Sequence, residues 1–140
     1  ANHEFGYPTL IIDLGTATKF LFIDKEGKFK TCAFVPGLEL SLHTLANNTA
    51  LLPNLGFDNV KGFLDLHNTA DVLTSSAYYS HVDTINGFVS RYQKEIGYPF
   101  HIVMTGGNIE LVKKGLNFKF NLVNNLCLKG IKVIKDRKAI

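Results

Sequence analysis

The stretch Ile11-Ile12-Asp13-Leu14-Gly15-Thr16-Ala17-Thr18 begins in one short apolar run and is followed by another. Short apolar runs bounded by polar turn residues are typical of buried strands. Glycine lets a ligand come close to backbone N–H groups, and threonine offers a hydroxyl donor, so the turn suits a bound phosphate. The same residues also suit an ordinary hairpin turn with Gly15 at positive φ. Taken alone, the stretch leaves both interpretations open.

The residues around this turn predict three strands joined by short connections. We expect strands at Thr9–Ile12, Phe20–Ile23 and Phe29–Val35. The polar segment 24–27 ends in a glycine and should reverse the chain, and Pro36-Gly37 should stop the third strand. The first part of the chain is therefore expected to form an antiparallel meander.

Two helices are expected next. Leucines recur at helical spacing from Leu38 to Leu45, and a longer helix should begin at Asn68 or Thr69, either of which can cap it, and stop at Gly97. Apolar side chains follow this second helix in steps of three and four residues, which predicts one stripe that is buried or meets a partner helix. The stripe consists of Tyr78, Val82, Ile85, Val89, Tyr92 and Ile96.

The last part of the chain alternates strands and helices. We expect a strand at His101–Met104, a short helix from Leu111 to Lys114, a strand at Phe118–Leu122 and a closing helix from Leu126 to Lys138. The order is then β-β-β-α-α-β-α-β-α. It predicts an α/β fold with a mixed sheet flanked by helices, in one domain spanning residues 1–140.

A second glycine-bearing turn, Thr105-Gly106-Gly107, follows the predicted fourth strand. Glycines at this place expose the N-terminus of the next helix, which suits a nucleotide phosphate or ribose. A tight turn between strand and helix is the simpler explanation when this motif is considered alone. The two turns together, each at the end of a strand, favour a nucleotide site.

Composition and charge exclude several other classes of protein. The net charge is +3, no apolar run reaches the ~20 residues of a membrane span, and the basic C-terminal residues are not interleaved with aromatic ones. The two cysteines are far apart, and no two histidines have the spacing of a helical metal pair. We expect a cytoplasmic protein that binds neither membrane nor nucleic acid.

The order of these motifs resembles that of type III pantothenate kinases. The first turn is similar to the second phosphate motif of that family, and Val103-Met104-Thr105-Gly106-Gly107 is similar to its adenosine segment. Val35-Pro36-Gly37 resembles the start of a family helix, and Thr49–Pro53 resembles the Thr-Ala-x-Leu-Pro that follows that helix. Asn68-Thr69 falls where the family has an Asn-Thr before a long helix.

The resemblance implies the C-terminal half of a ribonuclease H-like, actin-like ATPase fold, with the N-terminal domain absent. It also implies ATP-dependent phosphorylation of pantothenate, the first step of coenzyme A synthesis, with Mg²⁺ and a monovalent cation (K⁺ or NH₄⁺). The first phosphate loop and the aspartate that serves as catalytic base have no counterpart in this chain. We therefore expect no catalytic residue here and no activity from the chain alone.

The resemblance also implies roles for individual residues. Asp13 matches the position that binds the monovalent cation, and Thr69 matches a threonine that contacts pantothenate in a pocket completed across a homodimer. A plain helix cap is the alternative for Thr69. The residues expected to bind the nucleotide are Gly15, Thr16, Thr18, Thr105, Gly106 and Gly107.

Four positions depart from the family pattern. Lys19 stands where a second threonine is usual, Cys32-Ala33 replaces a pair of glycines, and Ser76 replaces a glycine of the long helix. These larger side chains would narrow the substrate pocket, so the resemblance implies nucleotide binding more strongly than it implies pantothenate binding. Three alternatives stay open: one subunit of a split kinase, a truncated chain, or a non-catalytic relative that acts as an accessory factor.

Overall fold

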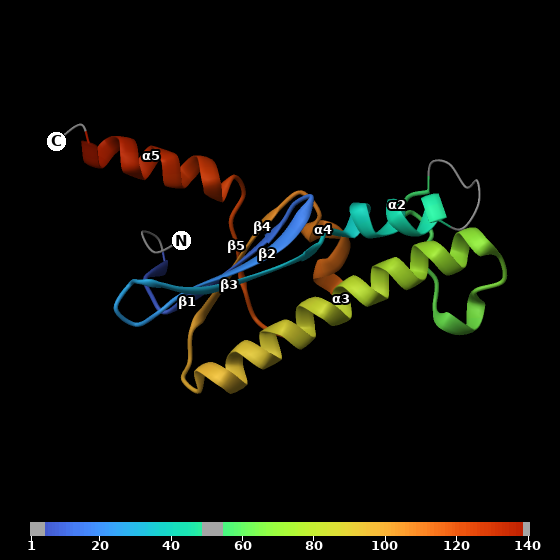
Figure 1. The fold of residues 1–140 in the computed structure, drawn as a ribbon, viewed down its shortest axis with the longest axis horizontal. Coiled ribbons are helices and arrows are strands. Elements are labelled where there is room, and N and C mark those ends of the chain that lie inside the picture. Colours follow the sequence, from blue (N-terminus) through green and yellow to red (C-terminus); the bar gives the residue numbers. More distant parts are fainter. Residues whose placement is uncertain (1–4, 49–54, 139–140) are drawn as a thin grey trace.

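The computed structural model describes residues 5–48 and 55–138, which form a five-stranded mixed sheet with helices around it (Figure 1). Strands β1 (Thr9–Leu14), β2 (Ala17–Ile23) and β3 (Phe29–Pro36) form the predicted antiparallel meander. Strand β4 (His101–Gly106) pairs in parallel with β1, and β5 (Asn121–Leu122) pairs in parallel with β4. The strand order β3-β2-β1-β4-β5 is that of a ribonuclease H-like α/β fold and confirms the predicted class.

One face of the sheet is covered by the second half of the long helix α3 (Thr69–Ile96), whose first half extends past the sheet beside α2 (Figure 1). Alternation along the strands sends one set of apolar side chains to this face. They are fully buried and pack against α3. The predicted helical stripe therefore belongs to the core of its own chain: Val82, Ile85 and Val89 are buried, and Tyr78, Tyr92 and Ile96 pack partly buried at its margin.

Both ends of α3 carry the expected stop signals. The side chain of Asn68 accepts a hydrogen bond from the N–H of Asp71 (2.9 Å), so Asn68 is the N-cap and Thr69 is the first helical residue. Gly97 adopts the left-handed conformation (φ 76°), and its N–H donates to the carbonyl of Gln93 (3.1 Å). Local sequence chemistry alone accounts for where this helix begins and ends.

A second, smaller cluster joins helix α2 (Leu38–Asn48) to the first half of α3. It consists of Leu42 from α2 with Leu73 and Ala77 from α3. The 3₁₀ turn η1 (Phe63–Asp65) lies in the connection between the two helices. The Thr49–Pro53 segment that entered the family resemblance lies outside the described residues.

Two predicted elements differ in the structure. The short helix α4 begins earlier than expected (Ile109–Val112) and passes into the 3₁₀ turn η2 (Lys113–Gly115). The predicted fifth strand is wrong in its first part, because only its last two residues pair with β4. Phe118 and Phe120 instead pack against the core, with their rings in an edge-to-face arrangement and the centroids 5.8 Å apart. Their alternation reflects packing against the core.

The closing helix α5 (Leu126–Lys138) lies on the side of the sheet opposite α3 (Figure 1). Three of its apolar side chains are exposed: Leu128, Ile131 and Ile134. The second face of the sheet therefore has far less cover than the first. None of the helices in the described ranges combines the length and the apolar character needed to cross a membrane.

Candidate functional site

The two glycine-bearing turns lie together at one end of the sheet. Strands β1 and β4 run in parallel with Asp13 opposite Thr105 and Leu14 opposite Gly106, so both strands end at the same edge. Gly106 has φ of 113°, and a Cβ added there would collide with the backbone of Leu14. Only glycine lets the second turn approach the first this closely. Ligands of open α/β sheets commonly bind at such a carboxyl edge.

The Pro36-Gly37 segment holds the first turn in place. The N–H of Gly37 donates to the carbonyl oxygen of Thr16 (2.8 Å). A Cβ on Gly37 would collide with the carbonyl oxygens of Thr16 and Gly15. The sequence indicated that this segment ends a strand and resembles the start of a helix; in the structure it also supports the turn.

Two cavities open beside these turns, and Gly107 borders both. The first measures about 480 Å³ and lies between the ends of β1 and β4 and the start of α5. The second measures about 550 Å³ and lies between the first turn, the start of α2 and the residues that follow β4. The first is lined by Asp13, Thr105, Gly106, Gly107 and residues 124–128, and the second by Leu14, Gly15, Thr16, Glu39, Leu40, His43, Gly107 and Asn108.

The first cavity contains polar groups that are available to a ligand. Thr105 is 4% exposed, and its hydroxyl makes no hydrogen bond within the part of the chain that the structure describes. A buried hydroxyl without a partner costs free energy, which a bound polar molecule would recover. Asp13 lies beside it, half-buried, and its carboxylate can only accept hydrogen bonds or bind a cation.

The surroundings of Asp13 suit Mg²⁺ and a monovalent cation differently. Mg²⁺ is usually held through substrate phosphates and one or two carboxylates, a role that Asp13 can fill. Lys19 is directly opposite Asp13 on β2, so a monovalent cation bound to this carboxylate would have a lysine as its neighbour on the next strand. Within residues 5–48 and 55–138, no three acidic, histidine or cysteine side chains gather around a common point where a metal ion could bind.

One predicted nucleotide ligand, Thr18, is not brought to this site. Thr18 faces α3 together with Phe20, because residues two apart on a strand share a face. Its side chain is buried, and its hydroxyl is 3.0 Å from Nε2 of His81. The geometry therefore corrects this part of the prediction and makes Thr18 a contact between β2 and α3.

The predicted pantothenate contact, Thr69, is also not among the residues that line either cavity. It is exposed at the start of α3, which lies near the far end of α2 (Figure 1). Thr69 and the two turns are thus separate features of this chain. The structure therefore does not bring Thr69 to the two cavities, and its predicted role stays a prediction.

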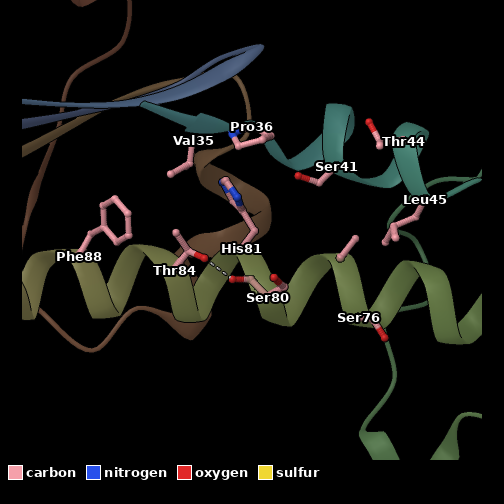
Figure 2. Close-up of a pocket in the computed structure, with 11 residues that line it drawn as sticks. Val35, Pro36, Ser41, Thr44, Leu45, Ser76, Ser80, His81, Thr84 and Phe88 are labelled. Atoms are coloured by element: carbon pink, nitrogen blue, oxygen red, sulfur yellow. Dashed lines mark hydrogen bonds between the residues drawn. The ribbon is translucent and has the colours of Figure 1, made fainter. Parts of the chain in front are cut away.

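A third cavity, of about 640 Å³, was not anticipated from the sequence. It lies between the end of β3, α2 and the middle of α3 (Figure 2). Hydroxyl groups and apolar side chains share its wall, and the imidazole of His81 extends from α3 toward β3. The lining residues are Val35, Pro36, Ser41, Thr44, Leu45, Ser76, Ala77, Ser80, His81, Thr84 and Phe88.

His81 is the one buried histidine among the described residues, at 5% exposed. Burial disfavours the charged imidazolium and lowers the pKa of His81 below its ordinary value. The imidazole is therefore neutral at physiological pH and can exchange one hydrogen bond with Thr18. In the sequence, the position of His81 one residue before Val82 of the apolar stripe was the one indication that its side chain would be buried.

Comparison with known proteins identifies the family. A family model described as type III pantothenate kinase matches residues 1–91. The chain is 31% identical over 128 residues to the type III pantothenate kinase of Persephonella marina, and 35% identical over 125 residues to that of Acholeplasma laidlawii. These matches cover 91% and 89% of the chain but 50% of each relative, so the chain spans about half their length.

A solved structure agrees at the level of the fold. A Campylobacter jejuni protein described as a Baf family transcriptional activator superposes with a TM-score of 0.55, at 14% identity. The match covers 95% of this chain and 60% of that one. Sequence motifs, strand order and relatives therefore agree: the chain belongs to the type III pantothenate kinase family.

Proposed function

We propose that this chain is the nucleotide-binding half of an ATP-dependent pantothenate kinase and corresponds to its C-terminal domain. The observation that supports this most strongly is the convergence of Asp13, the Gly15-Thr16 turn and the Gly106-Gly107 turn on two adjoining cavities. The first turn offers a hydroxyl and backbone N–H groups to phosphates. The hydroxyl of Thr105, which is buried beside Asp13, would bind the nucleoside.

In the complete kinase, the γ-phosphoryl group of ATP would pass to the primary hydroxyl of pantothenate and leave ADP. Phosphoryl transfer depends on positioning and on neutralising charge from both sides of the cleft. This chain would supply one side: it would bind ATP with Mg²⁺ and orient the phosphates along the first turn. The catalytic base and the first phosphate loop would come from the other half, either in the same polypeptide or in a second subunit.

Nucleotide binding by the purified chain tests the first part of this proposal. A fluorescent N-methylanthraniloyl ATP should bind, and Thr16→Val should weaken binding about tenfold, as expected when a hydrogen bond to a charged group is lost. Thr31→Val removes an exposed hydroxyl from β3 and is the matched control. Equal binding by the wild type and Thr16→Val would contradict the assignment of the first turn to phosphate.

Turnover tests the second part. A coupled ADP-release assay on the chain alone should show no pantothenate phosphorylation, because half of the cleft cannot neutralise the transferred phosphoryl group. Measurable turnover would show that the catalytic groups have been misplaced. ATP binding without turnover, even when the missing half is supplied, would favour the second candidate: a nucleotide-binding regulatory relative.

Pantothenate binding by Thr69 and a homodimer remain linked proposals. Thr69 is exposed and lines neither of the two cavities, and we propose that a second molecule completes the pantothenate pocket at this residue. The core stripe of α3 is not free for that purpose, because it already packs against the sheet. Sedimentation equilibrium of the chain will show whether it associates through another surface.

A further inference from the structure

The register of the sheet sets four side chains in a row beside the two turns. Lys19 on β2 is directly opposite Asp13 on β1 and also directly opposite Phe34 on β3. On the other side, Asp13 is opposite Thr105 on β4. Directly paired residues project from the same face. The row Phe34–Lys19–Asp13–Thr105 therefore crosses four strands on the face away from α3.

Burial increases along this row, from an exposed edge to a closed centre. Phe34 is 62% exposed, Lys19 is exposed, Asp13 is half-buried and Thr105 is 4% exposed. The ammonium of Lys19 lies 5.7 Å from the centre of the Phe34 ring, which attracts a cation. Lys19 is thus an exposed positive charge on the solvent side of the Asp13 carboxylate.

A shift of one side chain would bring this charge to the site. Directly opposite residues of an antiparallel pair have Cβ atoms about 5 Å apart, and lysine carries its ammonium on a flexible four-carbon stem. In the described part of the chain Lys19 makes no ion pair, so no such contact has to be broken. Only the weak contact with Phe34 would be given up.

The proposed ligand makes a positive charge necessary here. A polyphosphate would lie near the carboxylates of Asp13 and Glu39, which line the two cavities and would repel it. A lysine ammonium binds phosphate as a point charge. It would also repel a monovalent cation placed on the same carboxylate, whereas Mg²⁺ is held mainly by the phosphates.

We propose that the Lys19 ammonium, placed between Asp13 and the nucleotide phosphates, takes the role of the monovalent cation, so that this chain binds ATP without K⁺ or NH₄⁺. The proposal rests on the proposed nucleotide site and goes beyond it in naming the source of the charge. It replaces the monovalent cation that the family resemblance implies.

Nucleotide titrations in different salts test the proposal. Binding of N-methylanthraniloyl ATP with Mg²⁺ would be measured in choline, sodium, potassium and ammonium chloride at one ionic strength, because screening alone changes phosphate binding. The wild-type dissociation constant should agree within about twofold in all four salts, and Lys19→Thr should weaken binding about tenfold in choline chloride. Potassium or ammonium should restore much of the affinity of Lys19→Thr.

Two further variants test whether nucleotide binding requires the charge of Lys19 or only the packing of its side chain. Lys19→Met keeps an apolar stem against Phe34 and should lose affinity as Lys19→Thr does. Lys30→Thr removes an exposed positive charge from β3, away from the site, and should change binding less than twofold. Circular dichroism will confirm that each variant is folded.

Each outcome of these titrations decides a different point. Wild-type binding that requires potassium or ammonium, or full affinity of Lys19→Thr in choline chloride, would overturn the role of Lys19 and leave the nucleotide site intact. The absence of binding in every salt would overturn the nucleotide site and the role of Lys19 together.

Discussion

The two faces of the sheet differ in what their side chains do, and adjacent residues of β2 show the difference. Thr18 points to α3, is buried and contacts His81. Lys19 points the other way, is exposed and stands beside Asp13. The covered face stabilises the fold, whereas the open face carries the groups that can meet a ligand. Two adjacent residues can thus have different roles, one in stabilising the fold and the other beside the candidate ligand site.

The largest effect on stability is expected from a substitution in the core of the covered face. Phe20 is fully buried and packs against Phe88, with ring centroids 4.9 Å apart. Phe20→Ala should lower the free energy of unfolding by about 3–5 kcal/mol, because it leaves a cavity. Phe34→Ala on the open face should change it by about 0.5 kcal/mol or less. Urea denaturation of both variants measures the contrast; equal losses would contradict it.

An intermediate effect is expected where the two turns meet. Gly106→Ala should destabilise the protein by about 1–3 kcal/mol from backbone strain alone, and by more through its collision with Leu14. It should also weaken ATP binding. The neighbour Gly107 is a matched control, since a Cβ there meets nothing within 4 Å. If Gly107→Ala destabilised the protein as much as Gly106→Ala, the close approach of Gly106 to Leu14 would not explain why this turn contains glycine.

The smallest effect is expected from the pH dependence of the Thr18–His81 contact. Burial lowers the pKa of His81 in the folded protein, so the unfolded chain takes up its proton first. Stability should be complete above the ordinary histidine pKa of 6.5 and fall as the pH drops from there toward the lower folded value. Urea midpoints of the wild type between pH 8 and pH 5 measure this loss.

A pair of histidine variants assigns the effect. His81→Gln should be less stable than the wild type at pH 8 and should lose less on acidification. His43→Gln, which changes an exposed histidine, should keep the pH dependence of the wild type. If both variants behaved alike, the acid-sensitive contact would lie elsewhere in the chain.

Much of the candidate site could be predicted from local sequence, and Thr18 shows why one part of it could not. Asp13, Thr16, Thr105, Gly106 and Gly107 lie where strand ends and glycine turns placed them. Thr18 was grouped with them because it is close in the sequence, yet the strand alternation turns it to the other face. Nearness along a strand does not imply a shared face, and the sequence does not show which face will be covered.

The three-strand meander, the length of α3 and the residues at its two ends follow from local sequence. These features depend on periodicity and on cap and turn chemistry within a few residues, which a linear pattern contains. Three contacts appear only when the chain is folded: Gly37 supports the Thr16 turn, His81 reaches Thr18 across 63 positions, and Lys19 stands opposite Asp13. Such contacts depend on strand register and on how α3 packs, and these are set by the burial of the whole core rather than by any one segment.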